Sequence, residues 1–293
     1  MHFLNRKLIK FVLAVISIFL IIFYISRNKE FIEIYRDINY YYLYFVLILI
    51  VFRIYLHGVQ NSFLYKIAKV NLTVFESMNL YLRTILGNYI SFLQPGSGYK
   101  IAYLKLQHNL PVKDFFYLNI GLTTYRIILY TIFIMIYLVL QNFLSTTILL
   151  TTIALALVIV YIFKNYLKNI INEKFELNIK SFNYLNLIII FQLLINSYIF
   201  YLYFKILDLQ NSISEILIFF LVGTISDIIK ITPGNIGFRE TILILFESLH
   251  NILPSEILAV SFFARFTEVI FYTIVALIFV YIPFNNKEGN KWR

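Results

Sequence analysis

The chain has 293 residues, of which 60% are apolar and 14% charged, and its mean hydropathy is +0.79. Soluble domains are about half apolar and about a quarter charged, so this composition excludes a water-soluble globular enzyme. The net charge is +10, and the absence of cysteine excludes disulfides, thiolate metal sites and cysteine nucleophiles.

Several apolar segments are long enough to cross a bilayer, which takes about 20 residues in a helix. The sequence predicts six plain spans, at 8–26, 40–57, 115–140, 144–163, 184–207 and 255–283. No small-residue cleavage site follows the first span, so we expect a retained anchor and not a signal peptide. Arg53 lies inside the second span close to His57, and we expect it to snorkel to the membrane interface.

Two further apolar segments, 74–94 and 213–232, contain charged and polar residues. Each ends at a Pro-Gly pair, Pro95-Gly96 and Pro233-Gly234, and is expected to resume as a helix of about ten residues, because proline interrupts a helix. Broken helices in a membrane are tolerated where they are buried in protein or line a cavity.

The cationic loops predict how these broken segments sit in the membrane. If both crossed it, the Lys-containing loops 95–113 and 164–182 would lie outside, against the positive-inside rule. If both re-enter, these loops, the loop 58–72 and both termini lie inside. The sequence therefore predicts two re-entrant segments and cytoplasmic N- and C-termini in the cell membrane.

The two broken segments also resemble each other. The interval in sequence from Pro95 to Pro233 is within one position of the interval from Arg126 to Arg265, which lie in the spans that follow. Since the two segments would enter from opposite sides, the pattern predicts an inverted repeat, an architecture of transporters.

The predicted fold class is therefore all-α, a polytopic helical membrane bundle with six spans and two re-entrant segments. We expect one transmembrane domain over residues 1–293, with repeat half one at about 40–140, a linker span at 144–163 and repeat half two at about 184–283.

The re-entrant loops carry the predicted chemistry. A helix that starts after Pro-Gly presents unpaired N–H groups that favour phosphate or carboxylate, and a cation, Lys100 or Arg239, follows each loop. The loop residues are Pro95, Gly96, Gly98, Pro233, Gly234 and Gly237.

Charged groups inside apolar spans are costly, so they usually face a cavity or a partner. We predict lipid-phosphate binding by Lys100, Arg126, Arg239 and Arg265, with supporting polar groups at Asn88, Asp227, Glu240 and Glu268. Arg265 and Glu268 share one helix face and could pair, whereas Arg239 and Glu240 point to different sides.

Other site types have no sequence support. The histidines are isolated, no nucleotide phosphate loop is present, and the aspartates do not cluster as metal or sugar-nucleotide ligands would. The basic C-terminal tail lacks the aromatic pattern of nucleic-acid binding. We therefore expect no metal, no cofactor and no nucleic-acid partner.

Two motifs resemble those of a known family. Residues 231–240, ITPGNIGFRE, are similar to the "TPGxLGxRE" signature of the lysylphosphatidylglycerol synthase transmembrane-region, or flippase-like, family. Residues 93–105 resemble its looser "PGxxGxxxRAxYLK" region, with Lys100 near the usual arginine. Arg126 and Arg265 also fall where the family tends to place arginines, and the resemblance covers about 40–283.

The resemblance implies a multi-pass cell-membrane protein that handles an anionic lipid. Some relatives carry a soluble aminoacyl-transferase domain; because this sequence ends ten residues after its last predicted span, we do not expect the synthase activity. The leading hypothesis is a flippase that binds and translocates a phospholipid or a polyprenyl-phosphate lipid.

Two alternatives stay open. One is a membrane-embedded glycosyl- or aminoacyl-lipid transferase that uses Asp227, Glu240 or Glu268 as a base. The other is an accessory subunit of a separate lipid-modifying or glycosyl transferase.

Overall fold

The computed structural model describes residues 33–36, 38–90, 95–141, 179–227, 235 and 237–281. Throughout these ranges the regular structure is helical, with no strand. The helices are α3 (Tyr40–Ile67), α4 (Val74–Ile90), α5 (Pro95–His108), α6 (Val112–Leu140), α8 (Ile179–Ile206), α9 (Ile213–Ser226), α10 (Phe238–Leu245), α11 (Glu247–His250) and α12 (Pro254–Tyr281).

Among the described helices, four are long and apolar enough to cross a membrane: α3, α6, α8 and α12. They correspond to four of the predicted spans, which confirms an all-helical, multi-pass architecture. The other two predicted spans, 8–26 and 144–163, lie outside the described residues.

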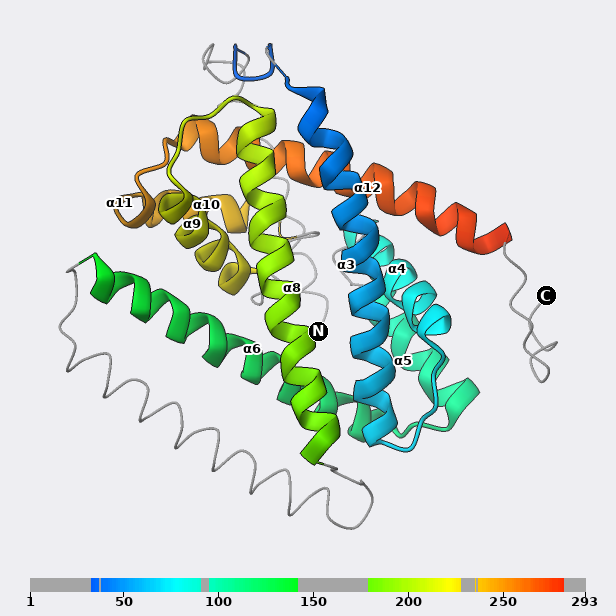
Figure 1. Ribbon diagram of the computed structural model, residues 1–293. Coiled ribbons are helices and arrows are strands. Elements are labelled where there is room, and N and C mark those ends of the chain that lie inside the picture. The colour runs from blue at the N-terminus through cyan, green and yellow to red at the C-terminus, as the bar shows by residue number, and fades with distance from the viewer. Residues whose placement is uncertain are drawn as a thin grey trace, which may run out of the picture.

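The centre of the molecule is an antiparallel pair, α3 and α8, which lie side by side in Figure 1. At one end, the backbone N–H of Asn39, just before α3, donates to the carbonyl oxygen of Ile206 at 2.9 Å. At the other end, the rings of Phe63 and Tyr184 lie 6.1 Å apart. Each helix has 28 residues, so the two match along their whole length.

Shorter helices flank this pair on both sides (Figure 1). The α4–α5 pair lies on one side, and α9, α10 and α11 lie on the other. The long helices then exchange sides, because α6 follows α5 but packs against α9, whereas α12 follows α11 but packs against α4. As a result, helix ends and polar side chains meet in the middle of the bundle.

Local signals account for the helix boundaries. The Asn39 side chain accepts from the N–H of Tyr41 at the start of α3, and Ser212 forms a capping box with Glu215 at the start of α9. Beyond α3 and α8, Lys69 and Asp208 adopt positive φ angles of 60° and 52°, the left-handed conformation that often ends a helix.

The interior is built from large apolar side chains. On α3, Ile50 and Ile54 are fully buried one turn apart, and they belong to one cluster with Tyr203, Phe204 and Phe219. Many outward apolar side chains are more than half exposed: Tyr40, Tyr41, Tyr44, Ile48, Tyr184, Leu187, Leu194, Tyr198, Phe266, Leu277 and Ile278 are examples. Such a surface would drive aggregation in water but matches the hydrocarbon of a bilayer.

The ends of both broken segments lie outside the described residues. Helix α4 stops at Ile90 and α9 at Ser226, while residues 91–94 and 228–234, including Pro233 and Gly234, lie outside the described residues. Pro95 is the first residue of α5, a position where the missing N–H costs nothing. The helices that follow have 14 residues in α5 and 8 in α10, against the ten expected.

Candidate functional site

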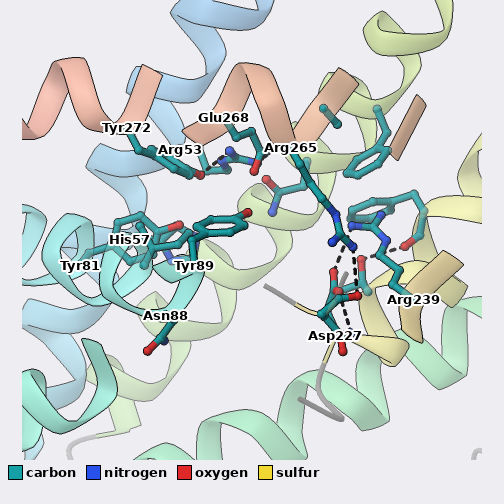
Figure 2. A pocket seen from close by; sticks show the side chains of 17 residues that line it. Arg53, His57, Tyr81, Asn88, Tyr89, Asp227, Arg239, Arg265, Glu268 and Tyr272 are labelled. Carbon is teal, nitrogen blue, oxygen red and sulfur yellow. Dashed lines mark hydrogen bonds and ion pairs between the residues drawn. The ribbon is translucent and has the colours of Figure 1, made fainter. Parts of the chain in front are cut away.

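A cavity of about 290 Å³ lies in the middle of the bundle (Figure 2). Its walls come from α3, α4, α8, α9, α10 and α12, so both halves of the chain contribute. The lining residues are Arg53, His57, Tyr81, Ile85, Asn88, Tyr89, Asn196, Phe200, Phe220, Thr224, Asp227, Asn235, Arg239, Ala264, Arg265, Glu268 and Tyr272.

Arg53 is held inside the bundle, and our expectation that it snorkels was wrong. Its Nη1 lies 2.9 Å from Glu268 Oε1, and its Nη2 donates to the hydroxyl of Tyr272. The two charged side chains are 8% and 12% exposed. The buried carboxylate of Glu268 offsets the desolvation cost of the Arg53 guanidinium, so this side chain does not extend to the membrane interface.

Arg239 approaches the cavity from α10 and pairs with Asp227, with 3.2 Å between Nη1 and Oδ2. Its guanidinium lies over the ring of Phe200 and against the backbone of α9 at Gly223. A Cβ at Gly223 would stand 2.9 Å from Nη2, so a glycine there makes room for the arginine. Asp227 is the most open of these charges, with 41% of its side chain exposed.

Arg265 pairs with Glu240, with 2.8 Å between Nη2 and Oε1, and does not pair with Glu268 as its spacing suggested. It also donates to the backbone oxygen of Asn235. The other oxygen of Glu240 accepts from the N–H of Gly237 at 2.8 Å, and Gly237 has a φ of 83°, which favours glycine. The Glu240 carboxylate therefore caps the N-terminus of α10 and also neutralises Arg265 of α12.

Despite these pairs, the cavity keeps spare hydrogen-bond donors. Arg239 Nε and Nη2 and Arg265 Nη1 are buried with no hydrogen-bond partner. A buried donor without an acceptor is costly, so these atoms favour an incoming ligand rich in acceptor oxygens. Figure 2 shows both arginines, with Asp227, on the wall opposite His57, Tyr81 and Tyr89.

The predicted site residues divide between two places. Arg239, Arg265, Asn88, Asp227 and Glu268 line the cavity, and Glu240 lies directly behind Arg265. Lys100 and Arg126 do not line it.

In the first half, Asn88 bridges the break between helices, since it accepts from the N–H of Ser97 and donates to the Ser97 hydroxyl. Gly96 faces the backbone of Thr84, whereas Gly98 has open space beside it. The Asn88 side chain therefore connects the end of α4 to the start of α5 across the break.

Sequence reasoning did not find several of the polar groups here. His57 stacks on Tyr81, with ring centroids 4.2 Å apart, and Asn196 of α8 also lines the cavity. His57 and Asn196 are separated in sequence by the same interval as Arg126 and Arg265, and so are Arg53 and Gln192. The repeat spacing, extended upstream of the broken segments, would have pointed to these two pairs.

No metal centre emerges in the part of the chain that the structure describes, where no three His, Asp or Glu side chains converge. The groups that do converge are arginines, carboxylates, amides and phenol hydroxyls. Such a set binds and orients polar ligands by charge and hydrogen bonding.

The fold and the cavity define a multi-pass helical membrane protein with a charged chamber inside its bundle. The chain belongs to the family described as "Lysylphosphatidylglycerol synthase TM region", whose model matches residues 8–276. Comparison with curated proteins and with solved structures gives no significant match.

Proposed function

We propose that this protein binds an anionic lipid through its phosphate and carries it across the cell membrane. The observation that carries the proposal is that Arg239 and Arg265 line the cavity and keep buried donor atoms without a hydrogen-bond partner. Guanidinium groups bind phosphate oxygens in pairs, and their hydrogen bonds strengthen where water is scarce. A phospholipid and a polyprenyl phosphate both offer such a headgroup.

The carboxylates at the cavity tune this attraction. Asp227, Glu240 and Glu268 balance Arg239, Arg265 and Arg53, so the empty chamber has no large net charge. A fully positive chamber would hold a phosphate too tightly to release it. Arginines that are already paired but keep spare donors bind an anion less tightly than unpaired arginines would, and a carrier must release its ligand.

An inverted repeat is part of the proposal, and helix boundaries support it. The interval in sequence from the start of α3 to the start of α8 equals the interval from the start of α4 to the start of α9. Lys69 and Asp208 share this interval, and both take the left-handed conformation. The equivalent helices α3 and α8 run antiparallel, as an in-plane two-fold axis requires, and α6 and α12 exchange sides in the same manner.

Equivalent contacts bridge both breaks, which further supports the repeat. Asn88 and Ser97 are hydrogen-bonded across the first break, and Asn235 Nδ2 donates to the Ser226 oxygen across the second. Asn88 matches Ser226 and Ser97 matches Asn235, because both pairs have the interval that separates the two loop prolines. We propose that two such hairpins re-enter from opposite sides and that the halves rock about α3 and α8 to give alternating access.

The test is translocation by the purified protein in liposomes that contain a fluorescent phosphate-bearing lipid. Arg239→Gln and Arg265→Gln should each slow movement at least tenfold, since each removes charged donors from the chamber. Arg83→Gln is the matched control, because Arg83 is an exposed arginine of α4 that does not line the cavity. Equal rates in wild type and in both cavity variants would refute the proposal.

A second candidate is a lipid-linked transferase, and the exposure of Asp227 favours it. All three carboxylates pair with arginines, but Asp227 is the most open of them, with 41% of its side chain exposed, so it is the carboxylate that a substrate can best reach. Product formation from a lipid-linked donor by purified protein, lost in Asp227→Asn, would support it. The third reading, a partner of a separate transferase, predicts that both arginine variants retain complex formation.

A further inference from the structure

Two cations of repeat half one, Lys100 on α5 and Arg126 on α6, differ from their counterparts in half two in the groups that they contact. Arg126 Nη2 donates to Gln60 Oε1 at 2.6 Å and to Gln192 Oε1 at 3.0 Å. Lys100 Nζ donates to Asn61 Oδ1 at 3.2 Å. Because Gln60 and Asn61 are neighbours on α3, the two cations meet the same turn of that helix.

The contrast with half two is one of charge. Arg239, the counterpart of Lys100, pairs with Asp227, and Arg265, the counterpart of Arg126, pairs with Glu240. Across the described residues, no carboxylate lies within ion-pair distance of Lys100 or Arg126. Half two therefore carries its own counter-ions, whereas the half-one cations contact, among the described residues, amide oxygens and, for Lys100, the ring of Tyr65.

Two like charges in this position are unfavourable without an anion. Lys100 and Arg126 bond to the adjacent residues Asn61 and Gln60, so their two positive charges repel each other. The amides beneath them are buried, with Gln60 and Gln192 each 2% exposed, so water offers limited screening there. An anion between the cations would remove the repulsion and offset part of their desolvation cost.

Among the groups named here, the buried atoms without any hydrogen-bond partner are donors. Arg126 Nε and Gln60 Nε2 are buried with no hydrogen-bond partner, and the Lys100 ammonium has three N–H bonds. The oxygens of Gln60 and Asn61 are turned to the cations. A ligand that fits must accept several hydrogen bonds and donate few, which describes a tetrahedral oxyanion.

Both cations are reachable, because Lys100 and Arg126 are half-buried while the amides behind them are fully buried. The position is separate from the cavity, whose lining includes neither residue. Gln192 links the two places, since it also lies 3.4 Å from His57 Nδ1, and His57 does line the cavity.

We propose that Lys100 and Arg126, with the amide of Gln60, form a second site that binds a phosphate-type oxyanion between α3, α5, α6 and α8. The site goes beyond the translocation proposed above, because it requires an anion to bind and nothing to be moved. Its ligand is either free phosphate or the headgroup of an anionic lipid.

The test is thermal unfolding of the full chain in an uncharged detergent, with potassium gluconate as the background salt. One arm adds inorganic phosphate, and the other adds phosphatidylglycerol, with phosphatidylcholine as the zwitterionic comparison. The variants are Arg126→Gln and Lys100→Gln, with Arg83→Gln as the matched control, because Arg83 is an exposed arginine of α4 that does not line the cavity. Each is measured with and without ligand.

We expect the ligand to raise the unfolding midpoint of wild type and of Arg83→Gln equally, and the ligand concentration at half-saturation to be at least about tenfold higher in Arg126→Gln and Lys100→Gln. Without ligand, Arg126→Gln should melt above wild type, because it removes a repelling charge; a merely structural arginine would do the reverse. A response to phosphate identifies a free anion, and a response to phosphatidylglycerol alone identifies a lipid headgroup.

An unchanged response in both half-one variants, or no response of wild type in either arm, would overturn the second site. The result for the half-one variants does not bear on translocation, which is measured separately with Arg239→Gln in liposomes. The two proposals therefore fail independently of each other.

Discussion

Arg53 of α3 and Glu268 of α12 form a buried ion pair with 2.9 Å between Nη1 and Oε1, although they are 215 residues apart in sequence. Tyr272, one turn beyond Glu268, accepts a second hydrogen bond from the same guanidinium. This contact joins the central helix α3 to α12, near the end of the chain, at the wall of the cavity.

Breaking this pair from one side should be costly. Glu268→Gln leaves the Arg53 guanidinium buried without its counter-ion, and we expect a loss of about 3–5 kcal/mol in the free energy of unfolding. The double variant Arg53→Met/Glu268→Met removes both charges and should recover much of that loss. Unfolding of wild type and the two variants in detergent measures this recovery, and a double variant less stable than Glu268→Gln would show that the pair is not a unit.

The close packing of α4 on α5 makes Gly96 sensitive and Gly98 tolerant. A Cβ at Gly96 would lie 1.9 Å from the backbone oxygen of Thr84, so Gly96→Ala should separate the helices and cost about 1–3 kcal/mol. A Cβ at Gly98 would meet nothing within 4 Å, and alanine favours helix by up to about 1 kcal/mol. Thermal unfolding of the two alanine variants should therefore move in opposite directions; equal losses would mean that this interface is loose.

His250, at the end of α11 and outside the long helices, should make stability depend on pH. Burial lowers the pKa of His250 below its ordinary value of 6.5, and its hydrogen bonds with Leu243 and Ile252 fit the neutral ring. Stability is therefore complete above pH 6.5, the pKa of the unfolded chain. It falls as the pH drops toward the lower pKa of the folded protein, because the unfolded state binds the proton first.

The measurement is the unfolding midpoint across about pH 7.5 to 5 for wild type and His250→Gln. The variant should be less stable at neutral pH and should lose most of the slope. A slope that persists unchanged would assign the pH dependence to other groups.

The absence of cysteine makes the proposed re-entry directly testable. Single cysteines at Lys69 and Asn109 flank the α4–α5 pair, and cysteines at Gln210 and Asn251 flank the α9–α11 segment. Re-entry predicts that a membrane-impermeant thiol reagent on intact cells labels the second pair and spares the first. Labelling of one member of each pair would instead mean that both segments cross the membrane.

Much of the fold could be read from local pattern. The spans 40–57 and 184–207 were predicted from apolar length, and the structure extends the first to Ile67 because the chain beyond His57 stays buried between helices. The short helix of α10 fell where its Pro-Gly pair and Glu240 indicated. In contrast, the ion-pair partners of the charged residues were predicted poorly. Arg265 pairs with Glu240 and not with Glu268, which is nearer to it in sequence.

The sequence by itself determined the class of protein, its family, the described helices and the repeat spacing, because apolar length, Pro-Gly breaks and residue order are local properties of the chain. Only the tertiary structure decided which charges are neutralised. Arg53, Arg239 and Arg265 each meet a carboxylate, and Lys100 and Arg126 meet amides. The reason is physical: within a low-dielectric bundle the state of a charge depends on groups brought close by folding, and its neighbours in sequence do not reveal them.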